Sequence, residues 1–125
     1  MGAKIQFFTD LIAWQVGHDL VLEIYTMTNH FPQRETFSLV DQMRRCVVSI
    51  TSNIAEGFSR KGIKEKQQFY YMALGSTTEL QNQLIIAKDL EYLSKEKYDE
   101  NIHLTIRVHK LLNGLIKSSS SVKSL

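Results

Sequence analysis

The chain has 125 residues, of which 43% are hydrophobic and 22% are charged, and its net charge is +2. This size and composition indicate one soluble globular domain with its own core. No apolar run reaches the ~18 residues of a membrane span, and the single Cys46 excludes an internal disulfide. One Pro and six Gly favour long helices over a turn-rich sheet. We therefore expect a cytoplasmic protein built from helices.

The first periodic segment covers residues 11–30. Pro32 ends it, because proline disfavours helical geometry in the residue before it. Apolar residues recur in this segment at spacings of three and four, which is typical of one buried helix face. They are Ile12 or Ala13, Val16, Leu20, Ile24, Met27 and Phe31.

The second segment covers residues 39–59. Ser38 and Asp41 form a Ser-x-x-Asp pattern that resembles a helix-capping box. Gly62, just beyond the segment, allows the chain to reverse. The apolar positions alternate at spacings of three and four, as in a coiled-coil seam: Val40, Met43, Val47, Ile50 and Ile54.

The third and fourth segments cover residues 63–91 and 95–117. Ser94 is a plausible N-cap for the fourth. The expected inner line of the third is Phe69, Ala73 or Met72, Ser76, Leu80, Leu84 and Ala87. That of the fourth is Tyr98, Ile102, Thr105 or Ile106, His109, Leu112 and Ile116. The Ser-rich tail, residues 118–125, is expected to be disordered.

Four amphipathic helices with short connections pack most simply as an antiparallel up-down-up-down four-helix bundle. We therefore predict an all-α protein with a single domain over residues 1–117.

Three stretches of the sequence are distinctive: "DLIAWQ", "QMRRCVVSITSNIAEG" and "GSTTELQNQLIIAKDLEYL". They resemble the bacterial family of 23S rRNA intervening-sequence proteins, a name that describes gene location and not function. The resemblance implies a four-helix bundle, often assembled as a ring-shaped homopentamer. One relative, the accessory subunit of diversity-generating retroelements, binds nucleic acid and a reverse transcriptase. The chain departs from many relatives at Gly17, where Ala is common, and at Thr51, where Pro is common.

Polar residues within these stretches form a predicted structural network: Arg45, Asn53, Glu56, Ser76 and Glu79. Residues equally far from the Lys61–Gly62 turn lie at the same height in a hairpin, so Arg45 and Glu79 are expected to form a partly buried ion pair. Small residues such as Gly75 and Ser76 are expected to let a neighbouring helix approach closely. A ligand or catalytic site is the less favoured interpretation of the same residues.

An enzyme is not expected from this sequence. A di-iron bundle needs two Glu-x-x-His motifs, whereas the chain has one, Glu100 to His103, and the second segment contains no His. No Ser-His-Asp pattern, phosphate-binding Gly loop or Cys-x-x-Cys pair is present. We predict a non-enzyme without catalytic residues, bound metal or cofactor.

Charge is unevenly distributed along the predicted bundle. Basic residues gather at the end that holds both termini and the turn between the second and third segments. Acidic residues gather at the opposite end. Summed over a ring, the basic ends would attract phosphates. Two hypotheses follow: an oligomer that binds RNA or DNA, or a protein-interaction scaffold with no nucleic-acid role. The candidate nucleic-acid-binding residues are Arg60, Lys61, Lys64, Lys66, Lys110 and Lys117.

The third segment also carries more apolar surface than one inner line requires. The surplus predicts a contact between copies of the chain, or a wide stripe that touches two neighbouring helices of the same bundle. The candidate interface residues are Trp14, Tyr25, Tyr70, Leu74 and Ile85. A five-fold ring is what the family resemblance implies.

Overall fold

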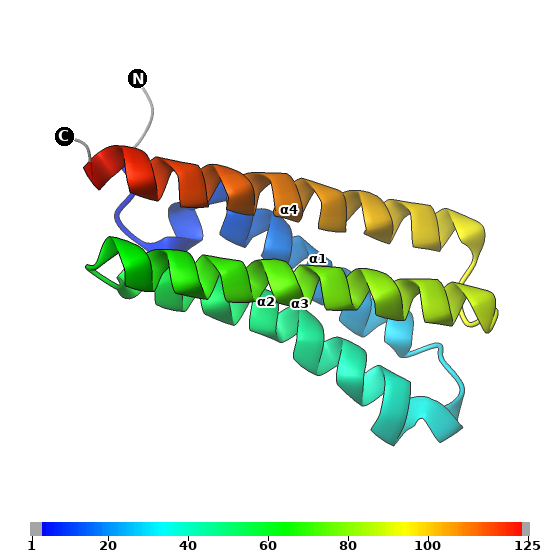
Figure 1. Ribbon diagram of the computed structural model, residues 1–125. Helices are drawn as coiled ribbons and strands as arrows, with labels where there is room; N and C mark the ends of the chain where they lie inside the picture. The colour runs from blue at the N-terminus through cyan, green and yellow to red at the C-terminus, as the bar shows by residue number, and fades with distance from the viewer. Residues whose placement is uncertain (1–3, 124–125) are drawn as a thin grey trace.

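The computed structural model describes residues 4–123 and forms a four-helix bundle (Figure 1). The helices are α1 (Ile12–Thr28), α2 (Asp41–Ser59), α3 (Ile63–Asp89) and α4 (Lys95–Lys123). Short 3-10 turns cover Phe8–Asp10 and Gln33–Glu35, and a π-helical turn covers Thr36–Val40. None of the described helices combines the length and hydrophobicity that a membrane span needs.

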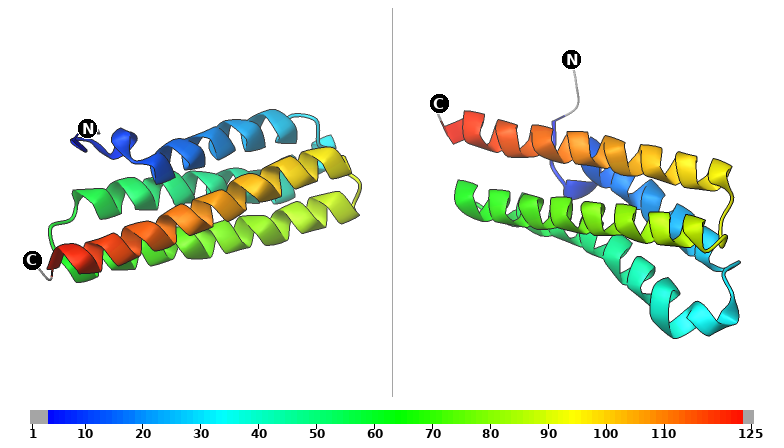
Figure 2. Two further views of the ribbon diagram at one scale, coloured as in Figure 1. Left: turned by 90° about the horizontal axis from the view of Figure 1, so that it is seen from above. Right: turned by 45° about the vertical axis from the view of Figure 1, so that its right-hand side comes forward.

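The helices alternate in direction, so the chain runs up, down, up and down (Figure 1). Both ends of the described chain lie at the same end of the bundle as the α2–α3 turn, as both views of Figure 2 also show. Each helix packs mainly against two others: α1 and α3 each lie against α2 and α4. The all-α fold is confirmed.

The predicted inner faces of α1 and α2 are confirmed. On α1, Ala13 and not Ile12 occupies the buried position, since Ile12 is half exposed. The remaining predicted positions are all buried, including Phe31 and Val40, which lie just outside the two helices: Val16, Leu20, Ile24, Met27, Phe31, Val40, Met43, Val47, Ile50 and Ile54.

The predicted inner face of α3 is partly wrong. Tyr70 is buried instead of Phe69, and Thr77 is fully buried while Ser76 is half-buried. Tyr70 turns inward because Gly57 on α2 leaves space for its ring, whereas Phe69 lies beneath the guanidinium of Arg60.

On α4 the buried line is shifted relative to the prediction. It includes Asn101 and Val108, which were not expected, while Tyr98, Ile102 and His109 are only half-buried. The fully buried or nearly buried residues of α4 are Asn101, Thr105, Val108, Leu112 and Ile116.

Several helix ends differ from the prediction. α1 ends at Thr28, whose hydroxyl donates to the carbonyl of Ile24. Ser38 does not cap α2; it lies in the π-helical turn, and its hydroxyl donates to the carboxylate of Glu35 in the preceding 3-10 turn. The N-cap role of Ser94 is confirmed, since its hydroxyl accepts the backbone N–H of Lys97 at 3.1 Å.

The expectation of a disordered tail is wrong for residues 118–123, because α4 continues to Lys123. The hydroxyls of Ser118 and Ser119 donate to the carbonyl of Leu115. Gln67 of α3 donates to the hydroxyl of Ser120 and so joins this segment to the bundle. Residues 124–125 lie outside the described part of the chain.

Gly17 of α1 and Thr51 of α2 lie close together where the two helices pack. A Cβ atom added to Gly17 would lie 3.0 Å from the methyl group of Thr51. Because Gly17 has no side chain, the branched side chain of Thr51 fits against α1 at this point.

The α3–α4 connection contains a strained residue. Glu91 has φ 62°, the only positive φ of a non-glycine residue between residues 4 and 123. The N–H groups of Tyr92 and Glu91 donate to the carbonyls of Ala87 and Lys88, which is the Schellman pattern that usually places glycine at this position.

Replacing Glu91 with Gly is expected to raise the free energy of unfolding by roughly 0.5–1 kcal/mol, because glycine adopts positive φ without steric cost. Urea denaturation measures the change. The matched control is Glu91→Ala, which removes the same charge but keeps the strain and should give no gain. Equal effects of the two variants would contradict the strain explanation.

Candidate nucleic-acid interface

The end of the bundle that holds the α2–α3 turn presents exposed lysines. Lys61 lies in the turn, Lys64 in the first turn of α3, and Lys117 near the end of α4, while Lys110 lies nearer the middle of α4. All four side chains are exposed. They come from three parts of the chain that the up-down topology places on the same half of the molecule (Figure 1).

Arg60 and Lys66, also candidates from the sequence, are occupied by contacts within the turn. The Arg60 guanidinium donates to Glu56 at 3.0 Å and lies 4.9 Å from the ring centre of Phe69. The Lys66 ammonium donates to the carbonyls of Gly57 and Phe58 at 3.2 and 2.8 Å. These carbonyls belong to the last turn of α2, so Lys66 stabilises the C-terminus of that helix. Burial lowers the pKa of Lys66.

The two halves of the bundle carry net charges of opposite sign. Residues 4–19, 50–76 and 107–123, the half around the termini, carry nine Lys or Arg and four Asp or Glu, a net charge of +5. Residues 20–49 and 77–106, the other half, carry six Lys or Arg and nine Asp or Glu, a net charge of −3. We call these halves the basic end and the acidic end.

A hollow of about 560 Å³ lies at the basic end, between the N-terminal segment and α2. Three of its seven lining residues are phenylalanines. Asp10 positions the segment that carries these rings, because its carboxylate accepts the N–H groups of Gln6 and Phe7 at 3.0 and 3.1 Å. We call this the aromatic hollow; it is lined by Phe7, Phe8, Ser52, Ala55, Glu56, Phe58 and Ser59.

The periodicity of the sequence did not predict this hollow. Phe7 and Phe8 precede the first helical pattern, so no periodicity pointed to them. The available signal was the pair of adjacent aromatic residues a few positions before Trp14, whose ring lies edge-on to Phe8 at 5.5 Å. Trp14 in turn stacks on His18 at 4.7 Å.

The predicted ion pair between Arg45 and Glu79 is wrong. Arg45 is exposed and pairs with Asp41 one turn earlier on α2, at 3.1 Å. Glu79 accepts a hydrogen bond from Gln83 on its own helix. Equal height in the hairpin does not bring two side chains together when they point in different directions around their helices.

The other members of the predicted polar network make mostly local contacts. Asn53 donates to the carbonyl of Ser49 at 2.8 Å, and Glu56 pairs with Arg60. Ser76 alone of the five joins two helices within the described chain: its hydroxyl bonds that of Ser49, and its carbonyl accepts the Cys46 thiol at 3.0 Å.

The candidate interface residues do not form one exposed surface. Tyr70 is buried in the core of the bundle and presents no surface to a second copy, so its assignment to the interface is wrong. Trp14 and Leu74 are half-buried. Tyr25 is 40% exposed beneath the guanidinium of Arg44, and Ile85 is 41% exposed.

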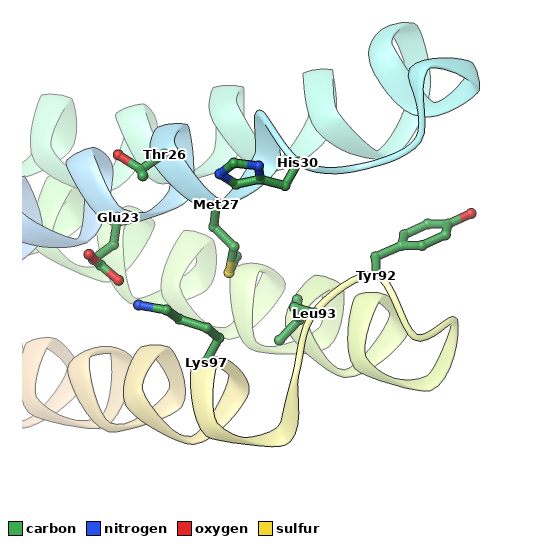
Figure 3. Close-up of a pocket in the computed structure, with 7 residues that line it drawn as sticks. All are labelled: Glu23, Thr26, Met27, His30, Tyr92, Leu93 and Lys97. Carbon is green, nitrogen blue, oxygen red and sulfur yellow. The ribbon is translucent and has the colours of Figure 1, made fainter.

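A smaller pocket of about 200 Å³ lies at the acidic end, between α1 and the start of α4 (Figure 3). The side chains of Glu23 on α1 and Lys97 on α4 point toward one another at one side of it. A hydrogen bond to Glu100 is the main reason that the pKa of Lys97 is raised, with Glu23 contributing. Within residues 4–123, no three His, Cys, Asp or Glu side chains are grouped so that they could hold a metal ion.

Comparisons with known proteins identify the family but not a function. A comparison with curated proteins finds no match. A solved structure from Bacteroides thetaiotaomicron, a protein of unknown function from the S23 ribosomal protein family, superposes with a TM-score of 0.80. It is 21% identical, and the match covers 87% of this chain and 98% of that one, so it shows that the fold is shared. The family model for 23S rRNA-intervening sequence proteins matches residues 9–114. The chain belongs to the family of 23S rRNA-intervening sequence proteins.

Proposed function

We propose that this protein is a non-enzymatic RNA-binding bundle that contacts phosphates through its basic end. The observation that carries the proposal is the separation of charge, +5 at one end and −3 at the other, with exposed Lys61, Lys64 and Lys110 on the positive half. Lysine ammonium groups that project into solvent bind phosphates without reading sequence.

Changing Lys61, Lys64 and Lys110 together to Gln is expected to weaken retention of RNA at least tenfold at low salt. Each lost phosphate contact should also reduce the slope of log affinity against log salt, by about 0.7 for single strands. Fluorescence anisotropy over a salt series measures both quantities. Arg60 and Lys66 are left unchanged because they stabilise the α2–α3 turn.

The matched control changes Arg34, Lys95 and Lys97, three exposed basic residues of the acidic end, to Gln. It removes the same total charge and should leave RNA binding within about twofold, because the contact is local. An equal loss in both variants would show attraction by net charge alone. Absence of binding by the parent protein at low salt would end the proposal.

We also propose that the chain self-associates into a homopentameric ring, which would place several basic ends on one rim. Exposed apolar side chains on α3 and at its C-cap support self-association: Met72, Ile85, Ile86 and Leu90 are each 40–51% exposed. Light scattering is expected to give a multiple of 14.4 kDa, and Ile86→Lys should shift the mass towards the monomer. A monomeric parent protein at high concentration would contradict the ring.

The same exposed side chains support the second candidate function, a protein-interaction scaffold. Phe37, which is 94% exposed in the π-helical turn, is the most prominent of the exposed large apolar residues. If RNA binding is absent while Phe37→Ser abolishes binding to a co-purified protein, the scaffold becomes the preferred function.

A further inference from the structure

We propose that the aromatic hollow binds an unpaired base, so that the ligand of the basic end is a single strand and not a duplex. This inference rests on the proposed function and specifies its ligand. Phe7 lines the hollow and is 57% exposed, and its ring lies 4.5 Å from that of Phe8, tilted by 33°. Phe58 forms part of the opposite wall, on α2. Bases stack on such side chains whatever their identity, since every base has a flat face.

Charge favours a nucleic acid over an apolar peptide as the occupant. The hollow belongs to the half of the molecule with net charge +5. The one charged side chain that lines it, Glu56, is paired with Arg60, and the Lys66 ammonium lies 5.4 Å from the ring centre of Phe58. The rim also carries the hydroxyls of Ser52 and Ser59. The volume of about 560 Å³ falls within the range of small-ligand sites, roughly 300–1,000 Å³.

The hollow continues along α2, which provides a path for the rest of a bound RNA strand. Ser52 lines both the aromatic hollow and a second hollow of about 580 Å³ between α1 and α2. Arg45 lines this second hollow with 80% of its side chain exposed and forms a solvent-exposed pair with Asp41 at 3.1 Å. It lies seven residues before Ser52, or about 10 Å along the helix. Arg44 is held by Thr28 and Asn29. A base in the aromatic hollow therefore leaves the adjoining backbone within reach of Arg45.

The decisive comparison uses two labelled oligonucleotides of equal length and charge, an oligouridine and the same strand without bases. The parent protein is expected to bind the oligouridine roughly 5- to 150-fold more tightly, which corresponds to one stacked base. Phe7→Ala should remove most of that preference and leave binding of the abasic strand unchanged. Phe37→Ala, an exposed phenylalanine at the acidic end, is the matched control and should change neither affinity.

Trp14 offers a second readout, because it is the single tryptophan of the chain and its ring contacts Phe8. Oligouridine should change its emission, and the abasic strand should not. Phe58→Leu keeps an apolar side chain against the core and tests the opposite wall.

Equal affinity of the parent protein for both strands would overturn the proposal that the aromatic hollow binds a base. The basic end would then remain a phosphate-binding surface only. Retention of the base preference in both Phe7→Ala and Phe58→Leu would also overturn the proposal, by placing the base elsewhere. Tighter binding of an RNA duplex than of oligouridine would reverse the assignment of the ligand class. Failure to bind any of these strands at low salt would end this inference and the proposed function together.

Discussion

Replacing Gly57 with Ala is expected to lower the free energy of unfolding by about 3 kcal/mol, because the added methyl group has no space. Its carbon would lie 2.6 Å from Cε1 of Tyr70 and 3.2 Å from Cβ of Phe69. Tyr70 is only 3% exposed, so its ring cannot turn aside without displacing the core. The α2–α3 turn would have to open instead. Urea denaturation followed by circular dichroism measures the loss.

Gly75→Ala is the matched control, since Gly75 also lies in a helix but has nothing within 4 Å of an added Cβ. Alanine should stabilise α3 there by roughly 0.5–1 kcal/mol through helix propensity. The two substitutions are chemically identical and are expected to change stability in opposite directions. Stabilisation by Gly57→Ala would show that α2 and α3 can separate at no cost.

A loss of stability at alkaline pH is the second large effect expected. Burial, and secondarily the charge of Glu79, raise the pKa of the Cys46 thiol from its ordinary value of 9.0 to about 12. Between these values the unfolded state has released a proton that the folded state still holds. The unfolded state therefore binds fewer protons, and stability falls as pH rises. Three pH units correspond to a loss of up to about 4 kcal/mol.

The measurement is urea unfolding at a series of pH values from 8 to 12, with Cys46→Ala for comparison. The difference in stability between parent and variant should decrease steadily above pH 9. Burial also raises the pKa of Tyr70, so both proteins should lose further stability above pH 10. Parallel curves for the two proteins would mean that the thiol ionises freely in the folded state.

The sequence predicted helices well where one apolar face was distinct from the rest of the helix. The regular spacing of Val47, Ile50 and Ile54 placed the face of α2 correctly, because large aliphatic residues rarely occupy any other position so regularly. In α3, aromatic residues occur at three consecutive positions, and periodicity could not decide which ring turns inward. The small residue opposite them, Gly57, decided it.

Buried polar residues caused most of the errors in the predicted buried faces of the helices. Asn101 is fully buried on α4, where its amide nitrogen donates to the carbonyl of Lys97 and approaches the sulfur of Met27. A rule that assigns burial by hydrophobicity excludes such a residue and shifts the whole face of the helix. The prediction for Gly75 failed for a different reason. This glycine was expected to let a neighbouring helix approach closely, but within the single bundle it faces open space.

The candidate site was predictable in its charge but not in its shape. Up-down topology follows from four helices with short connections, and it placed the lysines of distant segments on one half. The aromatic hollow depends on how the segment before α1 folds back on α2, held by Asp10 and by Gln15, which donates to the carbonyl of Thr9. Such contacts carry no periodic signal.

The separation of charge gives the molecule a preferred orientation during diffusion. The net charges of +5 and −3 belong to opposite halves of a rod whose longest fully described helix, α3 of 27 residues, spans about 40 Å. In the field of a polyanion such a rod turns its basic end forward before contact, so a larger fraction of encounters is productive. Salt should therefore slow association, whereas dissociation from a stacked base should depend on salt much less.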